Sequence, residues 1–489
     1  MAPGELQPLE DSTSVETPMP AGTRLVADRS FEWLADTLIA GGSPWRLLRL
    51  SEQGAALVAA WLAGEPVTAD RTAGGLARRL VDAGLAHPTI RSRALAPGEI
   101  DVVIPVRDDP SGLESLLRIC ARTPHMGVTV VDDGSLDAAA IDRIALAHGA
   151  TLLRHDVPLG PGAARNTGLG ATSAPLVAFL DADTVPDANW LTELVAHFDD
   201  PVVGAVAPRV RGPVGSSWRD RFEAAASPLD LGDQPGVVRA GTTVPFVPGA
   251  AIVVRRSAAG DGFDPTLRVG EDVDFVWRLA GRGWHVRYDP TVVVTHAARP
   301  SWFRWLAQRF AYGLSAAPLE ARHGDAVAPL RADPRVLATV GLVLLGRPRA
   351  AIGFLSWSAA SLARQLDGIA MRGGSESAAR QIAARGTALA APGLARSTFR
   401  AYGPLMVAGA IVMPVMRRPV VTVAAAATAV RWWRAGKPQP AFAFVSLSVL
   451  DDLAYGAGVL AGAVRTRRIG ALRPRIRPAS STVAPISRT

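Results

Sequence analysis

The sequence is poor in cysteine, in lysine and in long uncharged apolar runs. Among its 489 residues there is one cysteine, Cys120, which excludes an internal disulfide and is typical of a reducing compartment. Lysine also occurs once, so nearly all of the 52 basic residues are arginine. No apolar stretch reaches the roughly 18 uncharged residues of a simple membrane span, and Glu5, Glu10 and Asp11 argue against a signal peptide. We therefore expect a protein in the cytoplasm or on the cytoplasmic face of the cell membrane.

The composition favours a folded chain whose positive charge is uneven. Hydrophobic residues make up 48% of the sequence, which argues against general disorder, and the length allows about two or three domains. The formal net charge is +8, and the segment Arg465–Thr489 contains seven arginines and no acidic residue. Such a tail suits anionic lipid headgroups as well as phosphate. Because arginine is abundant throughout, its number is weak evidence for nucleic acid, and we expect no nucleic-acid partner.

Shifts in composition divide the chain into five segments. We expect a disordered N-terminus over 1–22, a small winged-helix-like module over 23–92, an α/β domain over 98–320, an apolar helical region over 330–465 and a basic disordered tail over 466–489. The apolar stretches of the helical region are Val336–Gly346, Ala401–Met416, Pro419–Val430, Pro440–Leu450 and Leu453–Val464. Charged residues keep them short, so they suit a membrane interface, re-entrant hairpins or a soluble helical bundle.

The small module has a strand–helix–turn–helix pattern. Trp45–Leu50 predicts a strand, Glu52–Ala63 a first helix and Leu76–Gly84 a second helix. This order resembles a winged-helix module, and the run Leu50–Ala56 resembles small peptide-binding proteins of peptide-derived cofactor pathways. The alternative is a packing cap on the main domain.

The α/β domain alternates apolar strands with helices, which predicts βαβ units on a mixed, mostly parallel sheet flanked by helices. The expected strands are Val102–Val106, Val128–Val131, Leu152–Leu153, Leu176–Leu180, Val202–Ala207 and Ile252–Val254. Ligands of such sheets bind at the carboxyl ends of the strands. The residues with chemical functions fall at those ends.

Two early motifs have the composition of a nucleotide site. A strand that contains Pro105 is followed by a second strand ending in Asp132-Asp133-Gly134-Ser135, where a carboxylate can accept from a uracil N–H or a ribose hydroxyl. A helix N-cap is the alternative role. The glycine-rich run Gly160–Gly168 then permits close backbone approach, and Arg165 within it can meet a base or a diphosphate oxygen. A surface helix with an Arg cap is the alternative there.

Leu180-Asp181-Ala182-Asp183 follows a buried strand and predicts a metal site. Alternate residues of an extended segment project the same way, so Asp181 and Asp183 can bind one hard cation, Mg²⁺ or Mn²⁺, against the diphosphate of a nucleotide sugar. His296, after the apolar strand Val292–Thr295, can add a nitrogen ligand. A partly buried structural histidine is the alternative.

A second acidic motif opens a helix at Gly270-Glu271-Asp272. Asp272 is the candidate general base for an incoming hydroxyl, and Glu271 is the alternative base or a group that orients it. Acidic residues at a helix N-terminus also stabilise the helix without any catalytic role. Trp302 and Trp305 lie further along the chain, where they would either stack on an acceptor sugar or pack in the core.

The order of these motifs resembles glycosyltransferases of family 2 with the GT-A fold, over about Asp101–Ala317. The resemblance implies a metal-dependent hexosyltransferase that inverts the anomeric carbon by direct displacement. It implies donor contacts from Pro105, Asp132 and Arg165, metal and donor contacts from Asp181 and Asp183, and base catalysis by Asp272. One departure is that Trp305–Phe310 does not match the Q-x-x-R-W of processive synthases, which favours a short product over a long polysaccharide.

The whole architecture is most similar to the mycofactocin-system glycosyltransferases of actinobacteria. The likeness rests on the small module with Gly41–Pro44, the GT-A domain and the run Tyr312–Leu319. It implies transfer of β-1,4-linked glucose from UDP-glucose to pre-mycofactocin. Two alternatives remain open: a membrane-associated transferase for a polyprenyl phosphate or a cell-envelope glycan, and an inactive GT-A scaffold that docks pathway partners.

Overall fold

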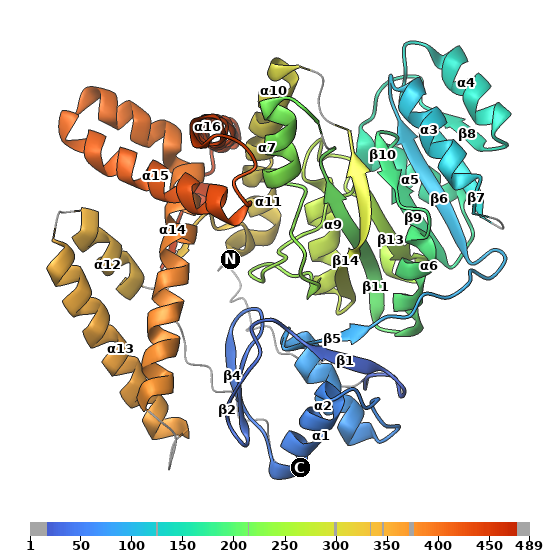
Figure 1. Ribbon diagram of the computed structural model, residues 1–489. Coiled ribbons are helices and arrows are strands. Elements are labelled where there is room, and N and C mark those ends of the chain that lie inside the picture. Colours follow the sequence, from blue (N-terminus) through green and yellow to red (C-terminus); the bar gives the residue numbers. More distant parts are fainter. Residues whose placement is uncertain are drawn as a thin grey trace, which may run out of the picture.

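The computed structural model describes residues 17–123, 126–213, 215–297, 301–332, 334–344, 347–370 and 376–476. Figure 1 shows three parts: a small N-terminal module in blue, a central α/β domain, and a set of C-terminal helices in orange and red. Most of the N-terminal segment expected to be disordered, and most of the basic tail, lie outside the described residues. The central domain therefore carries the functional argument.

The N-terminal module combines short strands with two capped helices. Its elements are β1 (Arg24–Ala27), β2 (Glu32–Ala35), β3 (Leu38–Gly41), β4 (Arg46–Arg49), α1 (Glu52–Leu62), α2 (Arg71–Asp82) and β5 (Ala86–Thr89). Strands β2, β3 and β4 form an antiparallel sheet, and β1 pairs with β5. Helix α2 begins at Arg71 rather than at the predicted Leu76, because the Asp70 side chain accepts from the Ala73 N–H and caps the helix there.

The central sheet is mixed, with strand order β10-β14-β11-β13-β9-β6-β7-β8 and β12 beside β14. Strands β9, β6, β7 and β8 run parallel, β13 is antiparallel to both β9 and β11, and β11 is parallel to β14. The bounds are β6 (Ile100–Val106), β7 (Gly127–Asp132), β8 (Thr151–Arg154), β9 (Leu176–Leu180), β10 (Thr184–Pro186), β11 (Val203–Arg211), β12 (Gly236–Val237), β13 (Ala251–Arg255) and β14 (His285–His296). Every strand expected from the sequence lies within or overlaps one of these.

Helices cover both faces of this sheet, so its strands are apolar on both sides. Val102 and Ile104 of β6 pack with one set of helices, whereas Val103 between them packs with the other set. The first set is α3 (Pro110–Cys120), α4 (Ala138–Ala147) and α6 (Trp190–Val195); the second includes α5 (Pro161–Ala171), α8 (Arg256–Ala259) and α9 (Glu271–Gly281). Cys120 lies in the first of these cores.

The C-terminal part is helical. Its helices are α10 (Trp302–Leu314), α11 (Ala316–His323), α12 (Pro334–Leu344), α13 (Pro348–Ala370), α14 (Glu376–Val412), α15 (Arg417–Arg434) and α16 (Ala441–Thr466). Two short strands, β15 (Arg331–Ala332) and β16 (Arg475–Ile476), pair with each other. Helix α7 (Trp218–Ala226) belongs to the central domain. Helices α10 and α16 can approach closely because Gly313 and Gly458 have no Cβ. A Cβ on Gly313 would overlap the backbone of Tyr455, and a Cβ on Gly458 would overlap the backbone of Phe310.

The apolar stretches Pro440–Leu450 and Leu453–Val464, which Asp451 and Asp452 interrupt in the sequence, belong to a single helix. One helix, α16, runs through Asp451 and Asp452, each 1% exposed. Their charges do not end the helix because arginines of three other helices pair with them. Among the described helices, α16 has the length and apolar character to cross a membrane, but 50% of that apolar window is buried inside the protein. Its buried aspartates fit a packed helix of a bundle.

Candidate active site

Three predicted metal ligands meet at one edge of the central sheet. Asp181 and Asp183 follow β9, and His296 ends β14, where it pairs in register with Thr184 of β10. One ligand atom from each of Asp181, Asp183 and His296 lies within 4.8 Å of the others. The His296 Nδ1 lies 3.0 Å from the Ala297 carbonyl, which can only accept, so Nδ1 carries the proton. The lone pair of Nε2, 3.4 Å from an Asp183 oxygen, then faces the carboxylates. This donor set fits a divalent cation.

Arg165 connects this cluster to the acidic motif of α9. Its guanidinium donates to Asp181 Oδ1 at 2.7 Å and to Glu271 Oε1 at 2.8 Å, and it lies over the Phe263 ring at 5.2 Å. The side chain is buried, so both ion pairs lie in a medium where they are strong. Burial alone would lower the pKa of Arg165, but the carboxylates of Asp181 and Glu271 raise it above the ordinary value. Arg165 therefore keeps its charge and holds the two motifs together.

Glu271 and Asp272 begin α9 and have different surroundings. Burial, together with the neighbouring charge of Asp272, raises the pKa of Glu271 to about 7, although Arg165 opposes the shift. Asp272 accepts from the Gly249 N–H at 2.9 Å, and burial raises its pKa despite that bond and the nearby Arg165. Glu271 is buried against Arg165, whereas Asp272 is only partly buried. Asp272 is thus the member of the pair with access to a substrate, and Glu271 positions Arg165.

The predicted donor-binding aspartates at the end of β7 hold a loop. Asp132 accepts from the Ser135 N–H at 2.9 Å and pairs with Arg154. Asp133 accepts from the N–H groups of Leu159 and Gly160, both at 2.8 Å, just before α5. These contacts fix the entry to the helix that carries Arg165.

A histidine also contacts the Asp133 carboxylate and helps to fix its position. His155 Nδ1 lies 2.8 Å from Asp133 Oδ1, and its Nε2 lies 2.9 Å from the Thr167 hydroxyl of α5. Burial would raise the pKa of Asp133, but the bonds from His155 and from the loop lower it overall. The carboxylate therefore stays charged, and both of its oxygens serve the loop. Contact of Asp132 and of Pro105, in the adjacent β6, with a nucleotide stays a prediction.

The two candidate acceptor-binding tryptophans differ in their exposure to solvent. Trp305 is 1% exposed, packs against Phe222 and donates its indole N–H to Glu223 at 2.7 Å. A buried ring offers no face to a sugar, so the prediction for Trp305 is wrong and core packing is its role. Trp302 is 52% exposed on the first turn of α10, and its acceptor contact stays a prediction.

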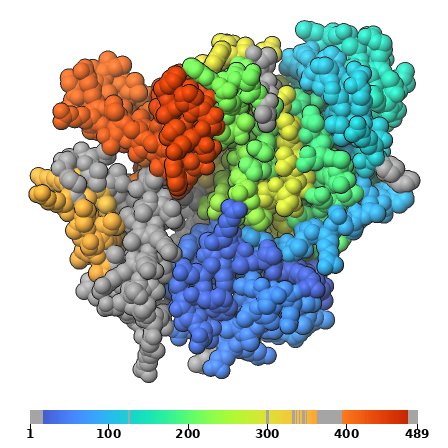
Figure 2. Space-filling model, in the orientation of Figure 1, coloured from blue at the N-terminus to red at the C-terminus, as the bar shows by residue number. Residues whose placement is uncertain are grey.

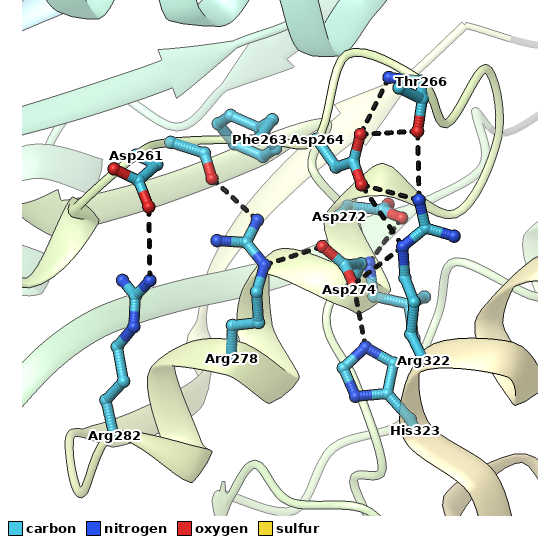
Figure 3. A network of polar contacts seen from close by, with 12 residues as sticks. Asp261, Phe263, Asp264, Thr266, Asp272, Asp274, Arg278, Arg282, Arg322 and His323 are labelled. Carbon is cyan, nitrogen blue, oxygen red and sulfur yellow. Dashed lines mark hydrogen bonds and ion pairs between the residues drawn. The ribbon is translucent and has the colours of Figure 1, made fainter.

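The sequence interpretation missed a polar network that fixes the start of α9 (Figure 3). Asp274 is 1% exposed; it accepts from Arg278 at 2.7 Å and lies 2.8 Å from Nε2 of His323, at the end of α11. Arg322 of α11 donates to Asp264 at 2.7 Å, in the loop that leads to α9. The hydrogen bonds from Thr266, together with this one from Arg322, lower the pKa of Asp264 to about 2.

Asn166, the neighbour of Arg165, completes the support of the same loop. Its amide donates to the Phe263 carbonyl at 2.7 Å, and its oxygen accepts from the Phe263 N–H at 2.8 Å. In the sequence, the position of Asn166 directly after Arg165 was the signal that could have indicated this contact. Asn166 and α11 together hold the segment between β13 and Asp272 on both sides.

Comparison with known proteins agrees with this geometry. Residues 101–263 match the family model of glycosyl transferase family 2. The fold and the carboxylates at the strand ends thus define a family 2 glycosyltransferase with the GT-A fold. The glycosyltransferase AglE of Haloferax volcanii is 26% identical over 218 residues, which are 41% of this chain and 67% of that protein.

A second relative aligns along nearly the whole chain. The pre-mycofactocin glycosyltransferase of Mycobacterium tuberculosis (strain ATCC 25618 / H37Rv) is 39% identical over 473 residues, which cover 94% of this chain and 99% of that protein. The chain therefore belongs to the mycofactocin-system glycosyltransferases of family 2. Among solved structures, the mannosyltransferase PcManGT from Pyrobaculum calidifontis, in complex with GDP-Man and Mn²⁺, is 19% identical and has a TM-score of 0.37 over 70% of this chain and 91% of that one. A likeness of that size has no bearing on substrates.

Proposed function

We propose that this enzyme transfers a hexose, glucose in β-1,4 linkage, from UDP-glucose to pre-mycofactocin, with inversion at the anomeric carbon. Successive transfers would build a short oligosaccharide on this small-molecule acceptor. The observation that carries the proposal is the assembly of Asp181, Asp183 and His296 around one point, joined through Arg165 to the helix that presents Asp272. The choice of acceptor rests on the identity to the Mycobacterium tuberculosis enzyme over 94% of the chain.

In this proposal Asp272 is the general base. Its carboxylate takes the proton of the acceptor hydroxyl as that oxygen bonds to the anomeric carbon from the side opposite the nucleotide. The bond from that carbon to the diphosphate oxygen breaks at the same time, and its electron pair leaves with the nucleoside diphosphate. The Gly249 N–H holds one Asp272 oxygen at 2.9 Å, which orients the carboxylate for this task.

Asp181, Asp183 and His296 would hold a Mg²⁺ or Mn²⁺ ion. When bound, such an ion neutralises charge on the diphosphate and so makes the nucleotide a better leaving group. Arg165 holds Asp181 in place for that role, because its guanidinium donates directly to the Asp181 carboxylate. The ion pair to Glu271 keeps Arg165 itself from turning away.

The test is a turnover assay with the full chain, UDP-glucose, Mg²⁺ or Mn²⁺, and purified pre-mycofactocin, with the products followed by mass spectrometry. The proposal expects products that are heavier by one or more hexose units. Release of UDP and glucose without such products would contradict the acceptor and would direct the search to lipid-linked or envelope glycans. An absence of both transfer and donor hydrolysis, with either ion, would contradict the enzymatic proposal and favour a scaffold.

A further inference from the structure

The turn between α14 and α15 presents a cluster of exposed apolar side chains. Ile411 is 72% exposed, Val412 79%, Met413 48% and Val415 81%, and Val421 on the first turns of α15 is 66% exposed. We call these five residues the hairpin tip. A single exposed apolar side chain is ordinary, but a contiguous set of this kind marks a surface that binds another apolar surface.

Among the described side chains of the hairpin, those behind the tip include a buried apolar cluster that joins the two helices. Phe399 of α14 and Val420, Val423 and Ala427 of α15 form a buried cluster, against which Leu453 of α16 also packs. Figure 2 shows the hairpin, in orange, as a lobe that projects from the body of the molecule. The α16 contact fixes the base of the hairpin, and the tip therefore extends from a rigid support.

The charge around the tip has one sign. Arg417 and Arg418, directly after the tip, are both exposed. No aspartate or glutamate occurs between residues 377 and 450, whereas the exposed Arg434 and Lys437 lie at and just beyond the far end of α15. An apolar cluster bordered only by cations is complementary to an apolar layer with an anionic surface, which is the profile of a bilayer with acidic headgroups.

A second copy of the chain fits this surface poorly. In a symmetric dimer formed through the tip, Arg417 and Arg418 of one protomer would face the same arginines of the other, with no acidic residue between 377 and 450 to offset them. Arginine side chains beside a bilayer can instead extend to the headgroups while the apolar residues enter the acyl region.

We propose that the hairpin tip is a membrane-docking site that inserts Ile411, Val412, Met413 and Val415 into the interface of an anionic bilayer, with Arg417 and Arg418 at the headgroups. In this proposal only the tip enters the bilayer interface. This inference is independent of the proposed donor and acceptor. It assigns the glycosyltransferase domain to the face of a membrane.

The experiment is co-sedimentation of the full chain with vesicles of phosphatidylcholine alone and with vesicles that contain phosphatidylglycerol. We expect binding to the anionic vesicles that weakens with added salt. The double variant Ile411→Asp/Val415→Asp should weaken binding roughly tenfold or more, and Arg417→Gln/Arg418→Gln should weaken it while removing much of the salt dependence. Melting temperatures of all variants are measured alongside, to show that they remain folded.

Matched controls lie on α4, far along the chain from the hairpin. Leu146 is 77% exposed and Arg143 is exposed, so Leu146→Asp and Arg143→Gln make the same chemical changes outside the tip and should bind as the unmodified protein does. Three results would overturn the proposal: no vesicle binding by the unmodified chain, equal binding by the tip variants, which would assign binding to the basic tail, or light scattering in which the tip variants convert a dimer to a monomer.

Discussion

Arg165 is a buried cation among carboxylates, and its two ion pairs explain how so many acidic groups share one small space. Asp181 and Glu271 each accept one of its N–H groups, and Asp272 lies close enough to contribute to its pKa. Without that charge the carboxylates would repel one another, and protonation would relieve the repulsion. A protonated Asp272 cannot accept a proton from a hydroxyl, so the state of Arg165 bears directly on catalysis.

The pH dependence of Glu271→Gln tests this coupling. Activity requires ionised Asp272, whose pKa is raised by burial, so kcat/KM should fall as the pH drops through that raised pKa. Burial and the charge of Asp272 raise the pKa of Glu271 to about 7, so Glu271 is largely neutral at the pH where Asp272 takes up its proton, and a neutral amide in its place should leave the acid limb where it is. The measurement is kcat/KM from pH 5 to 8 for both proteins. An acid limb that moves to lower pH would show that Glu271 carries its charge while Asp272 titrates, and would contradict this order of ionisation.

At the scale of elements, α11 supports the loop and the helix that present the catalytic acidic motif. His323 bonds to Asp274 near the start of α9, and Arg322 bonds to Asp264 in the preceding loop. The two contacts come from adjacent residues of α11 and reach two sides of the same segment. A shift of α11 would therefore move Asp272 relative to Gly249.

Arg322→Ala is expected to lower kcat several-fold more than it changes the KM for the donor, because it loosens the loop without touching the metal ligands. The stability cost should be about 1 kcal/mol, since the Arg322–Asp264 pair is partly exposed. Arg282→Ala is the matched control, because Arg282 pairs with Asp261 at 3.7 Å near the opposite end of α9. Steady-state kinetics and thermal unfolding of both variants measure these effects. Equal kcat values for the two would contradict a positioning role for Arg322.

The central elements could be predicted because apolar strands alternate with helices there. β9 spans Leu176–Leu180, as predicted, since Pro175 precedes it and the acidic motif ends it. The roles of single acidic residues were harder to predict. Asp133 has the sequence context of a nucleotide contact, yet its oxygens accept from Leu159 and Gly160, and no local pattern specifies that use. His323 could not be predicted as a partner of Asp274, because 49 residues separate them.

At the scale of the whole molecule, a buried ion-pair cluster connects the glycosyltransferase domain to the C-terminal helices. Asp451 of α16 lies 2.8 Å from Arg309 of α10, 3.3 Å from Arg400 of α14 and 3.5 Å from Arg431 of α15. Four helices thus meet at one carboxylate, and Arg309 also pairs with Glu223 of α7. The sequence showed Asp451-Asp452 only as an interruption of an apolar run, because its partners are distant in the chain.

Asp451→Asn should destabilise the folded protein by about 3–5 kcal/mol, because it leaves buried arginines with one anion fewer. Asp142, exposed on α4, gives the matched control Asp142→Asn, which should change the unfolding free energy by less than about 0.5 kcal/mol. Denaturant unfolding followed by tryptophan fluorescence measures both. A loss below about 1 kcal/mol for Asp451→Asn would show that the cluster contributes little to holding the helices on the domain.

The measurement that tests the central claim most directly is donor binding and hexose transfer by Asp272→Asn and Asp183→Ala, side by side. The account predicts that Asp272→Asn loses transfer by roughly a hundredfold or more while binding UDP-glucose nearly as well as the unmodified enzyme. Asp183→Ala should weaken metal-dependent UDP-glucose binding itself. Near-normal turnover by Asp272→Asn, or metal-dependent donor binding unchanged in Asp183→Ala, would contradict the assignment of the base or of the metal site.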